Sequence, residues 1–182
     1  MKEIEISIAT KQDIPILADI FWSHINANHE YISHGEVQMG VGVAKINSNG
    51  DICTFPAENG KEMWLQYISS KLDNQSFAAV LKAELKAESK SEDQNLIAGF
   101  CVVEIDEDGS SPYGMLCDLL VREQYRSLGI GNLLMHEALS WFKKHEISDI
   151  YLESGKNNHD AHSFFQKRGF QHISEIFKLK TY

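Results

Sequence analysis

The amino-acid sequence predicts an α/β (α+β) fold, in which helices flank a central sheet of about six to seven strands. Two kinds of segment carry this prediction. Short segments either alternate apolar and polar residues or are apolar throughout, as strands do, while longer segments repeat apolar residues every three or four positions, as helices do. The chain has 182 residues, so we expect one domain that spans residues 1–182.

The first half of the chain predicts a strand, a helix and then a less regular stretch. Apolar and polar residues alternate from Ile4 to Ile8, which is typical of a strand with one buried face. Thr10 stands three residues before Asp13, so a capped helix is expected to begin here and to end near residues 26–28. Glycines interrupt residues 29–55 and leave their structure open. The other elements predicted in this half are a helix at residues 58–72, strands at 77–85 and 96–105, and a hairpin loop at 86–95.

The second half predicts one buried strand followed by an amphipathic helix. Residues 115–121 are apolar apart from Asp118, which suits a strand that is buried on both faces. A short strand at 150–152, a helix that Asn158 caps and Gly169 ends, and a final strand or pair of strands at 173–179 complete the chain. The amphipathic helix is predicted from the apolar spacing of Leu133, Leu134, Ala138, Leu139, Trp141 and Phe142, and from Lys143, Lys144 and His145 at its end.

Composition excludes several classes of protein. A net charge of −9 argues against sequence-independent binding of nucleic acid, which needs a clustered basic face. The apolar stretches are too short to span a bilayer and the N-terminus does not resemble a signal peptide, so we expect no membrane partner and a cytoplasmic protein. The three cysteines are expected to be reduced. The eight histidines lack the paired spacing of metal ligands, so no metal site is predicted.

The loop Arg126-Ser127-Leu128-Gly129-Ile130-Gly131 lies between the buried strand and the amphipathic helix. Backbone amides gather at a helix N-terminus and favour an anion such as phosphate, and glycine lets the backbone approach it closely. The spacing of two glycines alone fits a plain tight turn equally well. A dinucleotide-binding fold would need glycine at Leu134, and a Walker loop would need a Gly-Lys-Ser/Thr sequence that is missing here.

Two longer blocks identify a family. Residues 119–131 resemble the pyrophosphate-binding motif of GNAT acetyltransferases, Arg/Gln-x-x-Gly-x-Gly/Ala after a strand. Residues 158–170 resemble the closing motif of the same family, an asparagine followed by alanine, an aromatic pair and Gly-Phe. The resemblance implies the GNAT acyl-CoA acyltransferase fold, with a mixed, mostly antiparallel central sheet flanked by helices. It also implies acetyl-CoA as co-substrate.

The resemblance further implies which residues contact coenzyme A. Leu119 and Val121 are expected to pair their backbone with the pantetheine arm, and Asn158 to hydrogen-bond the same arm, although a plain helix cap explains Asn158 equally well. Phe165 occupies the position where many family members carry a tyrosine that protonates the departing thiolate. The pyrophosphate is expected to contact the backbone of Arg126, Ser127, Leu128, Gly129, Ile130, Gly131 and Asn132.

The catalytic residues are less clearly marked. Asp118 is the best candidate for orienting the acceptor amine or accepting its proton, because a charge inside an apolar strand is costly unless it is used or paired. A structural hydrogen bond is an equally good explanation. The family's oxyanion donor is usually a backbone amide of the central strand, here near Leu119 or Leu120. Cys117 is expected to be a buried structural thiol, and water, His159 or His162 remain candidates for the acid that Phe165 cannot supply.

The acceptor is expected to be the primary amine of a small molecule. Tyr31, His34 and Glu36 are candidates for contacting it, because the segment after the first helix commonly walls the acceptor site in this family, but solvated loop residues are the commoner explanation of such a cluster. Acetylation of a protein N-terminus or lysine, and a catalytically inactive CoA-binding sensor, are the alternatives. A phosphate-binding domain unrelated to acetyl transfer is the weakest of the four. Dimers are frequent in the family, which leaves a homodimer open.

Overall fold

The structure is a computed structural model that describes residues 3–86, 96–107, 109, 111–179 and 181. The chain forms two compact units. The first unit contains residues 1–23 and 65–152, and the second contains residues 24–64 and 153–182. The single domain expected from the sequence stays a prediction.

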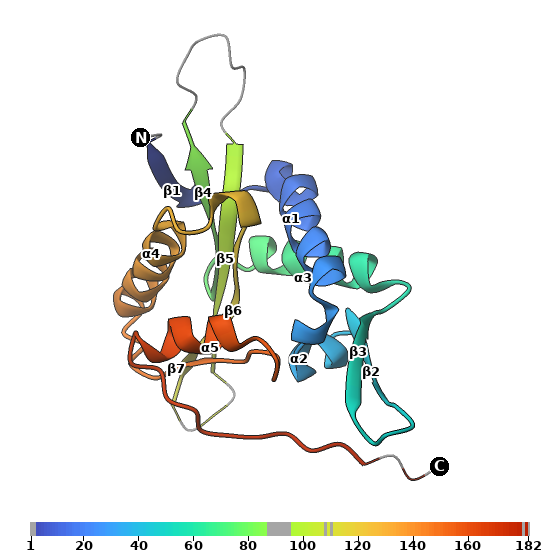
Figure 1. Cartoon of the computed structure of the whole chain (residues 1–182). Coiled ribbons are helices and arrows are strands. Elements are labelled where there is room, and N and C mark those ends of the chain that lie inside the picture. Colours follow the sequence, from blue (N-terminus) through green and yellow to red (C-terminus); the bar gives the residue numbers. More distant parts are fainter. Residues whose placement is uncertain (1–2, 87–95, 108, 110, 180, 182) are drawn as a thin grey trace. The chain divides into compact units, whose positions relative to one another are not determined.

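The first unit is built on a five-stranded sheet in the order β1-β4-β5-β6-β7 (Figure 1). Neighbouring strands are antiparallel except β6 and β7, which run parallel. This confirms the mixed, mostly antiparallel sheet. The strands are β1 (Ile4–Ile8), β4 (Ala78–Leu85), β5 (Leu96–Asp106), β6 (Tyr113–Val121) and β7 (Ile150–Leu152). The sequence predicted each of them to within two residues at either end, while the loop expected at 86–95 lies outside the described residues except for Lys86.

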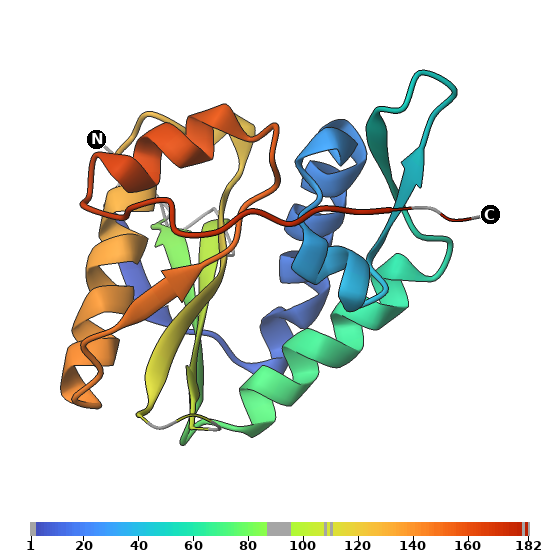
Figure 2. The same cartoon turned by 90° about the horizontal axis from the view of Figure 1, so that it is seen from below.

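Helices cover both faces of this sheet. The long helix α4 (Ile130–Lys144) packs against one face, and α1 (Ile14–Ala27) and α3 (Gly60–Asp73) lie on the other (Figure 2). On α4 the buried side chains include Leu134, Ala138 and Phe142, which follow one another at four-residue intervals. The ring of Phe142 lies so close to Gly114 of β6 that a Cβ atom there would come within 2.5 Å of it. Leu133 and Leu139, predicted on the apolar face, are instead exposed.

The entry to α1 shows the predicted cap. A short 3-10 turn η1 (Lys11–Asp13) precedes the helix. The Asp13 carboxylate accepts hydrogen bonds from the Thr10 amide at 2.7 Å and from the Thr10 hydroxyl at 3.0 Å. Lys82 of β4 donates to the other oxygen of Asp13 at 3.0 Å. The cap therefore joins the start of α1 to β4, the second strand of the sheet.

The second unit contains a hairpin, short helices and the C-terminal segment. The stretch that the sequence left open forms η2 (His29–Tyr31), α2 (His34–Gln38) and the antiparallel hairpin of β2 (Gly42–Ile46) and β3 (Ile52–Pro56). His29 fastens the hairpin, because its ring stacks on Phe55 with centroids 5.3 Å apart and its Nδ1 lies 2.7 Å from the Thr54 carbonyl oxygen. The last helix of the unit is α5 (His159–Gln166), which begins after Asn158 as the sequence predicted and ends two residues before the predicted end near Arg168.

The final strand expected at residues 173–179 is wrong. These described residues carry no strand pairing, and their apolar side chains are open to solvent, with Phe177 87% exposed. Lys178 donates to the carbonyl of Ala44 at 3.0 Å, but a strand requires a ladder of backbone hydrogen bonds with a neighbour. Among the described residues the central sheet therefore has five strands rather than the six to seven expected, and the two other strands form the separate β2–β3 hairpin.

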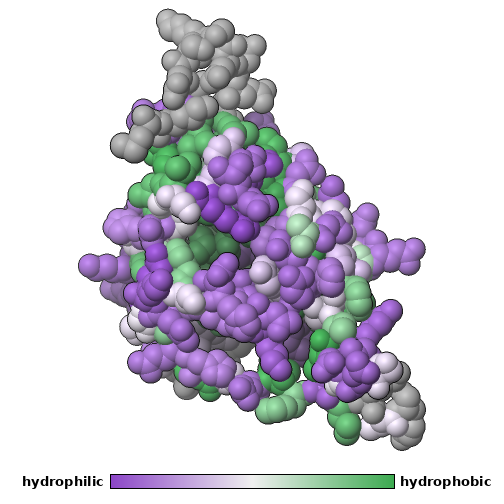
Figure 3. Space-filling view, viewed as in Figure 1, coloured by the Kyte–Doolittle hydropathy of each residue, from purple (hydrophilic) through white to green (hydrophobic). Residues whose placement is uncertain are grey.

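Hydrophilic side chains dominate the face shown in Figure 3, as the charge of −9 leads one to expect. Among the described residues no helix combines the length and the hydrophobicity needed to cross a bilayer.

Candidate active site

The central feature of the first unit is a β-bulge in β6. Val102 of β5 pairs with Asp118 and the next residue, Val103, pairs with Leu116, so Cys117 is an extra residue without a partner on β5. A bulge bends the strand and places two consecutive residues opposite one. Bulges are frequent beside active sites, where they redirect a side chain.

Beyond the bulge one edge of β6 is open. The parallel neighbour β7 pairs only with residues 114–116, and no other described strand pairs with this edge from Cys117 to Val121. The amide of Arg122 donates to the carbonyl of Ala98 on β5, so the backbone of Arg122 faces β5. Because backbone groups alternate along a strand, Leu120 faces β5 as well, whereas Leu119 and Val121 present their N–H and C=O groups at the open edge.

A loop with unusual backbone angles follows this edge. After the short turn η3 (Glu123–Tyr125), Ser127 has φ 64° and Gly129 has φ 82°. Positive φ is uncommon outside glycine, and such residues gather where the chain forms concave clusters of amides that bind anions. A Cβ atom on Gly129 would meet nothing within 4 Å, so the space in front of the loop is open.

The loop leads directly into α4. Gly129 is the residue that precedes the helix, and its carbonyl accepts hydrogen bonds from the amides of Asn132 and Leu133 at 3.0 and 3.1 Å. The amides of Ile130 and Gly131 come before these and have no partner within the helix. Together with the positive end of the helix dipole they make this end of α4 suitable for a phosphate group.

Asp118 lies at the bulge and is held by a tyrosine that the sequence did not single out. The hydroxyl of Tyr67, on α3, donates to Oδ2 of Asp118 at 3.0 Å. Burial raises the pKa of Tyr67 well above its ordinary value, and the negative charge of Asp118 and the Cys117 thiol raise it further. In the sequence Tyr67 belongs to an apolar helical pattern, so it is indistinguishable from an ordinary core residue.

Cys117 extends this polar cluster toward α3 and β5. Its Sγ lies 3.9 Å from Oε2 of Glu104, and Glu104 pairs with Lys71, one helical turn beyond Tyr67. Burial, followed by the charges of Asp118 and Glu104, raises the pKa of the Cys117 thiol to about 12. A thiol with so high a pKa stays protonated near neutral pH and is a poor nucleophile.

Asn158 and Phe165 belong to the second unit. The side-chain oxygen of Asn158 accepts a hydrogen bond from the Ala161 amide at 3.3 Å, so the residue caps α5. Phe165 packs between two other rings, with centroids 5.5 Å from Phe164 and 5.8 Å from Phe170. The side-chain nitrogen of Asn158 takes no part in this hydrogen bond. Its contact with the pantetheine arm stays a prediction.

The three candidate acceptor residues have different surroundings. Glu36 accepts a hydrogen bond from the Ser33 amide at 2.6 Å, while Ser33 Oγ accepts from the Glu36 amide at 3.3 Å. This reciprocal pair caps α2, and the Ser-x-x-Glu spacing that signals it was readable in the sequence. Burial raises the pKa of Glu36, and nearby Glu153 raises it further. The hydrogen bonds from Ser33 lower the pKa but do not outweigh burial. His34 begins α2 and Tyr31 ends η2, and whether they contact an acceptor stays a prediction.

Two further contacts of the second unit were not foreseen. Gly155 packs against the backbone of Tyr31 so closely that a Cβ atom would overlap the Tyr31 carbonyl. Glu153 accepts a hydrogen bond from the Gly35 amide at 3.0 Å. The two contacts join the segment after β7 to the end of η2 and to the start of α2, and no sequence signal marks them.

Among the residues that the structure describes, no group of three or more His, Cys, Asp and Glu side chains is placed to hold a metal ion.

Comparison with known proteins identifies the family to which these motifs correspond. Residues 41–170 match the model of the acetyltransferase (GNAT) family. Streptothricin acetyltransferase A of Bacillus subtilis (strain 168) is 33% identical over 58 residues, which are 32% of this chain and 34% of the relative. The match therefore spans about a third of that relative's length.

Solved structures of similar fold cover the whole chain. The aminoglycoside 6'-N-acetyltransferase AAC(6')-IG of Acinetobacter haemolyticus has a TM-score of 0.62 at 15% identity, covering 98% of each chain. The aminoglycoside N-acetyltransferase AAC(6')-Iy in complex with CoA has a TM-score of 0.67 at 12% identity, covering 100% of this chain and 96% of the other. At such identities the likeness concerns the fold.

Proposed function

The chain belongs to the acetyltransferase (GNAT) family, as its two motifs indicated, and on that premise we propose that it transfers the acetyl group of acetyl-CoA to a primary amine of a small molecule. The observation that carries the proposal is the continuity of the open β6 edge with the loop at residues 126–131. An extended polar arm suits the edge, and a pyrophosphate suits the loop. Both features lie in the first unit.

Different residues of the loop and of β6 would contact different parts of the coenzyme. The amides of residues 126–132 would hold the pyrophosphate, with Arg126 adding positive charge. Leu119 and Val121 would pair with the pantetheine arm, because their backbone groups face the open edge. The same orientation favours the amide of Leu119 over that of Leu120 as the oxyanion donor, since Leu120 faces β5.

Direct transfer accounts for all atoms. Acetyl-CoA supplies an activated thioester. The nitrogen lone pair of the amine forms a bond to the carbonyl carbon, the oxygen takes up negative charge, and the carbon–sulfur bond then breaks to release the thiolate. Asp118 would accept the proton that the amine loses. The Cys117 thiol, with its pKa of about 12, is not required as a nucleophile.

Two observations favour a small cationic acceptor. The similar proteins named above act, by their names, on aminoglycosides and on streptothricin. The chain itself carries a net charge of −9, which attracts polycationic molecules. Acetylation of protein amines and a coenzyme-binding sensor without turnover are the alternatives, and Phe165, which has no hydroxyl, supports the sensor.

The test combines coenzyme binding with turnover. Calorimetry with coenzyme A measures binding. Thiol release from acetyl-CoA in the presence of aminoglycosides, polyamines and amino acids measures turnover. Gly129→Glu places a carboxylate at the phosphate loop and should abolish binding. Gly50→Glu is the matched control, because Gly50 also has positive φ, at 88°, and open space around it.

Binding with turnover on at least one amine supports an enzyme with a small-molecule acceptor. Binding without turnover favours the sensor or a protein acceptor. Absence of binding by the wild-type protein, or normal binding by Gly129→Glu, contradicts the proposed coenzyme site.

A further inference from the structure

A half-buried tyrosine lies next to the carboxylate proposed as the proton acceptor, outside both family motifs. Tyr67 is on α3 and its hydroxyl donates to Oδ2 of Asp118 at 3.0 Å. We propose that Tyr67 is a positioning residue for the acetyl transfer, whose hydroxyl fixes the Asp118 carboxylate at the bulge and favours its ionised, proton-accepting form. This inference rests on the proposed function. It adds Tyr67 to the residues of the site and predicts how kcat depends on pH.

The bulge explains why one tyrosine reaches two consecutive residues of a strand. In a regular strand the side chains of Cys117 and Asp118 would point to opposite faces of the sheet. Here Cys117 is an extra residue without a partner on β5, and Tyr67 meets both residues: its hydroxyl donates to Asp118, and both Asp118 and the Cys117 thiol raise its pKa. The irregularity that redirects the strand also brings Asp118 against α3.

The hydroxyl of Tyr67 can act only as a donor to the carboxylate. Burial, followed by the charge of Asp118, raises the pKa of Tyr67 well above its ordinary value, so the phenol stays protonated over the pH range in which proteins function. A hydrogen bond donated to a carboxylate stabilises its charged form. The hydroxyl therefore stabilises the ionised form of the Asp118 carboxylate.

Other ionisable groups surround the pair. Burial raises the pKa of the thiols of Cys117 on β6 and Cys101 on β5, and the negative charge of Asp118 raises both pKa values further. Behind Cys117 the Lys71 ammonium pairs with Glu104, and it also lies 5.2 Å from the centre of the Tyr67 ring. Lys71 is thus paired with Glu104, while the Tyr67 hydroxyl donates directly to Asp118.

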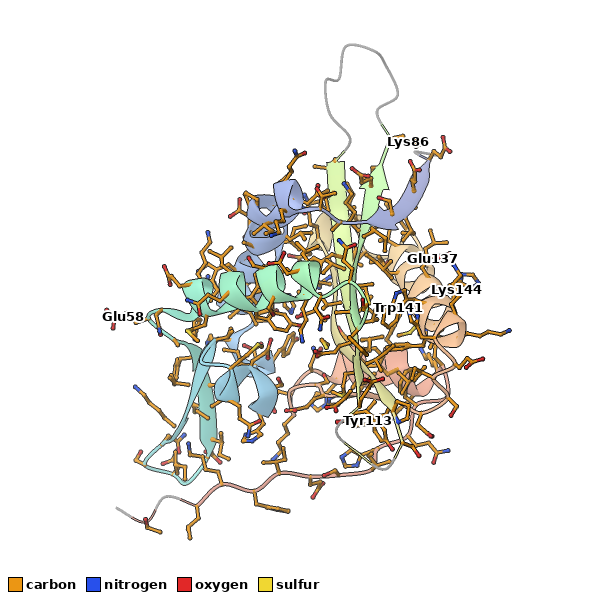
Figure 4. All side chains as sticks on the ribbon, turned by 180° about the vertical axis from the view of Figure 1, so that it is seen from behind. Glu58, Lys86, Tyr113, Glu137, Trp141 and Lys144 are labelled. Atoms are coloured by element: carbon orange, nitrogen blue, oxygen red, sulfur yellow. The ribbon has the colours of Figure 1, made fainter. Side chains whose placement is uncertain are left out.

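The experiment compares two tyrosine-to-phenylalanine substitutions, each of which removes a hydroxyl that donates to an aspartate of the sheet. Tyr67→Phe removes the hydroxyl at Asp118. Tyr113→Phe is the matched control, because the Tyr113 hydroxyl also donates to an aspartate, Asp106, at 2.7 Å, at the opposite end of β6 (Figure 4). Tyr67→Phe should lower kcat about tenfold and move the acid limb of the kcat profile up by about one pH unit, with KM for acetyl-CoA unchanged. Tyr113→Phe should leave both kcat and the acid limb of its pH profile unchanged.

Coupling to Asp118 distinguishes positioning from a general structural role. If Tyr67 acts through Asp118, then Tyr67→Phe in an Asp118→Asn background should cause no further loss of kcat. A full additional loss in the double variant, or a kcat and pH profile of Tyr67→Phe equal to those of Tyr113→Phe, overturns the inference.

A second readout does not depend on turnover. The pH midpoint of the Asp118 carboxyl carbon, followed by carbon NMR, should rise in Tyr67→Phe. A fluorotyrosine incorporated at position 67 keeps the ring and the hydroxyl but is a stronger donor, so the midpoint should fall. Unchanged midpoints overturn the inference even if the enzyme is active. Shifted midpoints in a protein that acetylates no amine uphold the contact and reject the proposed function instead.

Discussion

The side chain of Arg126 turns back to the strand that precedes it, where its Nε donates to the carbonyl of Val121 at 3.3 Å. Val121 ends β6, and Arg126 opens the loop at residues 126–131. The contact therefore fastens the loop to the open strand edge. It also leaves the terminal nitrogens of the guanidinium, on an exposed side chain, in position to meet an anion.

Arg126→Met should weaken coenzyme A binding about tenfold, because it removes both the charge and the contact with Val121. Lys144→Met is the control. Lys144 is another exposed cation, but it lies at the opposite end of α4 (Figure 4). Calorimetric titration at low salt measures both dissociation constants, and an equal effect of the two substitutions would mean that Arg126 acts only through net charge.

Asn158 can be tested for a role beyond its cap. Asn158→Asp keeps an oxygen that can accept from the Ala161 amide, whereas Asn158→Ala removes it and should lower the free energy of unfolding by about 1 kcal/mol. If the side-chain amide also donates to the pantetheine arm, Asn158→Asp should raise KM for acetyl-CoA while the melting temperature stays near that of the wild type. Normal KM in the aspartate variant assigns Asn158 to the cap alone.

Gly155→Ala should destabilise the second unit by about 3 kcal/mol, because its methyl group would overlap the carbonyl of Tyr31. Gly50→Ala provides the comparison. Gly50 has open space around it, so only its positive φ opposes alanine, at a cost of about 1 kcal/mol. Urea unfolding gives both values, and equal costs would contradict the close packing at Gly155.

The cap at α1 predicts a pH-dependent stability. Burial raises the pKa of Asp13, but hydrogen bonds from Thr10 and Lys82 outweigh it and leave the pKa below its ordinary value. Because the folded pKa is the lower one, this stabilisation is present above about pH 4, the unfolded value, and is lost as pH falls through the folded pKa. Asp13→Asn should therefore lower the free energy of unfolding by about 1–2 kcal/mol at pH 7, and by progressively less below pH 4.

Asp73→Asn is the control for this pH dependence. Asp73 pairs with Lys11, but both side chains are more than half exposed, and such a pair contributes under about 1 kcal/mol. Chemical denaturation between pH 3 and pH 8 compares the two variants. An Asp13→Asn effect that is constant over this range would contradict the role assigned to the charge.

The sequence predicted best those elements whose signals are local. Gly129 before α4, Asn158 before α5 and Gly169 after it mark helix ends through the backbone angles or hydrogen bonds that those positions require, and the structure has them there. The strand at 150–152 was also correctly bounded. The capping pair of Ser33 and Glu36 was equally local but was overlooked in favour of a role in acceptor binding.

The features that were missed depend on contacts between distant segments. Residues 173–179 are rich enough in apolar side chains for a strand, but a strand also needs a neighbour that no local pattern can supply. The bulge at Cys117 exists only in the register between β5 and β6. Tyr67 lies 51 residues from Asp118, so its hydrogen bond could not be inferred from the spacing of either motif.

The most direct test of the central claim is the identity of the product. The protein is incubated with acetyl-CoA and an aminoglycoside, streptothricin or polyamine, and mass spectrometry follows the amine while a thiol reagent follows coenzyme A. We predict that one amine gains a single acetyl group, in equal amount to the thiol released, and that Gly129→Glu forms neither product. Thiol release without any acetylated amine, or an unchanged rate in Gly129→Glu, would contradict the account.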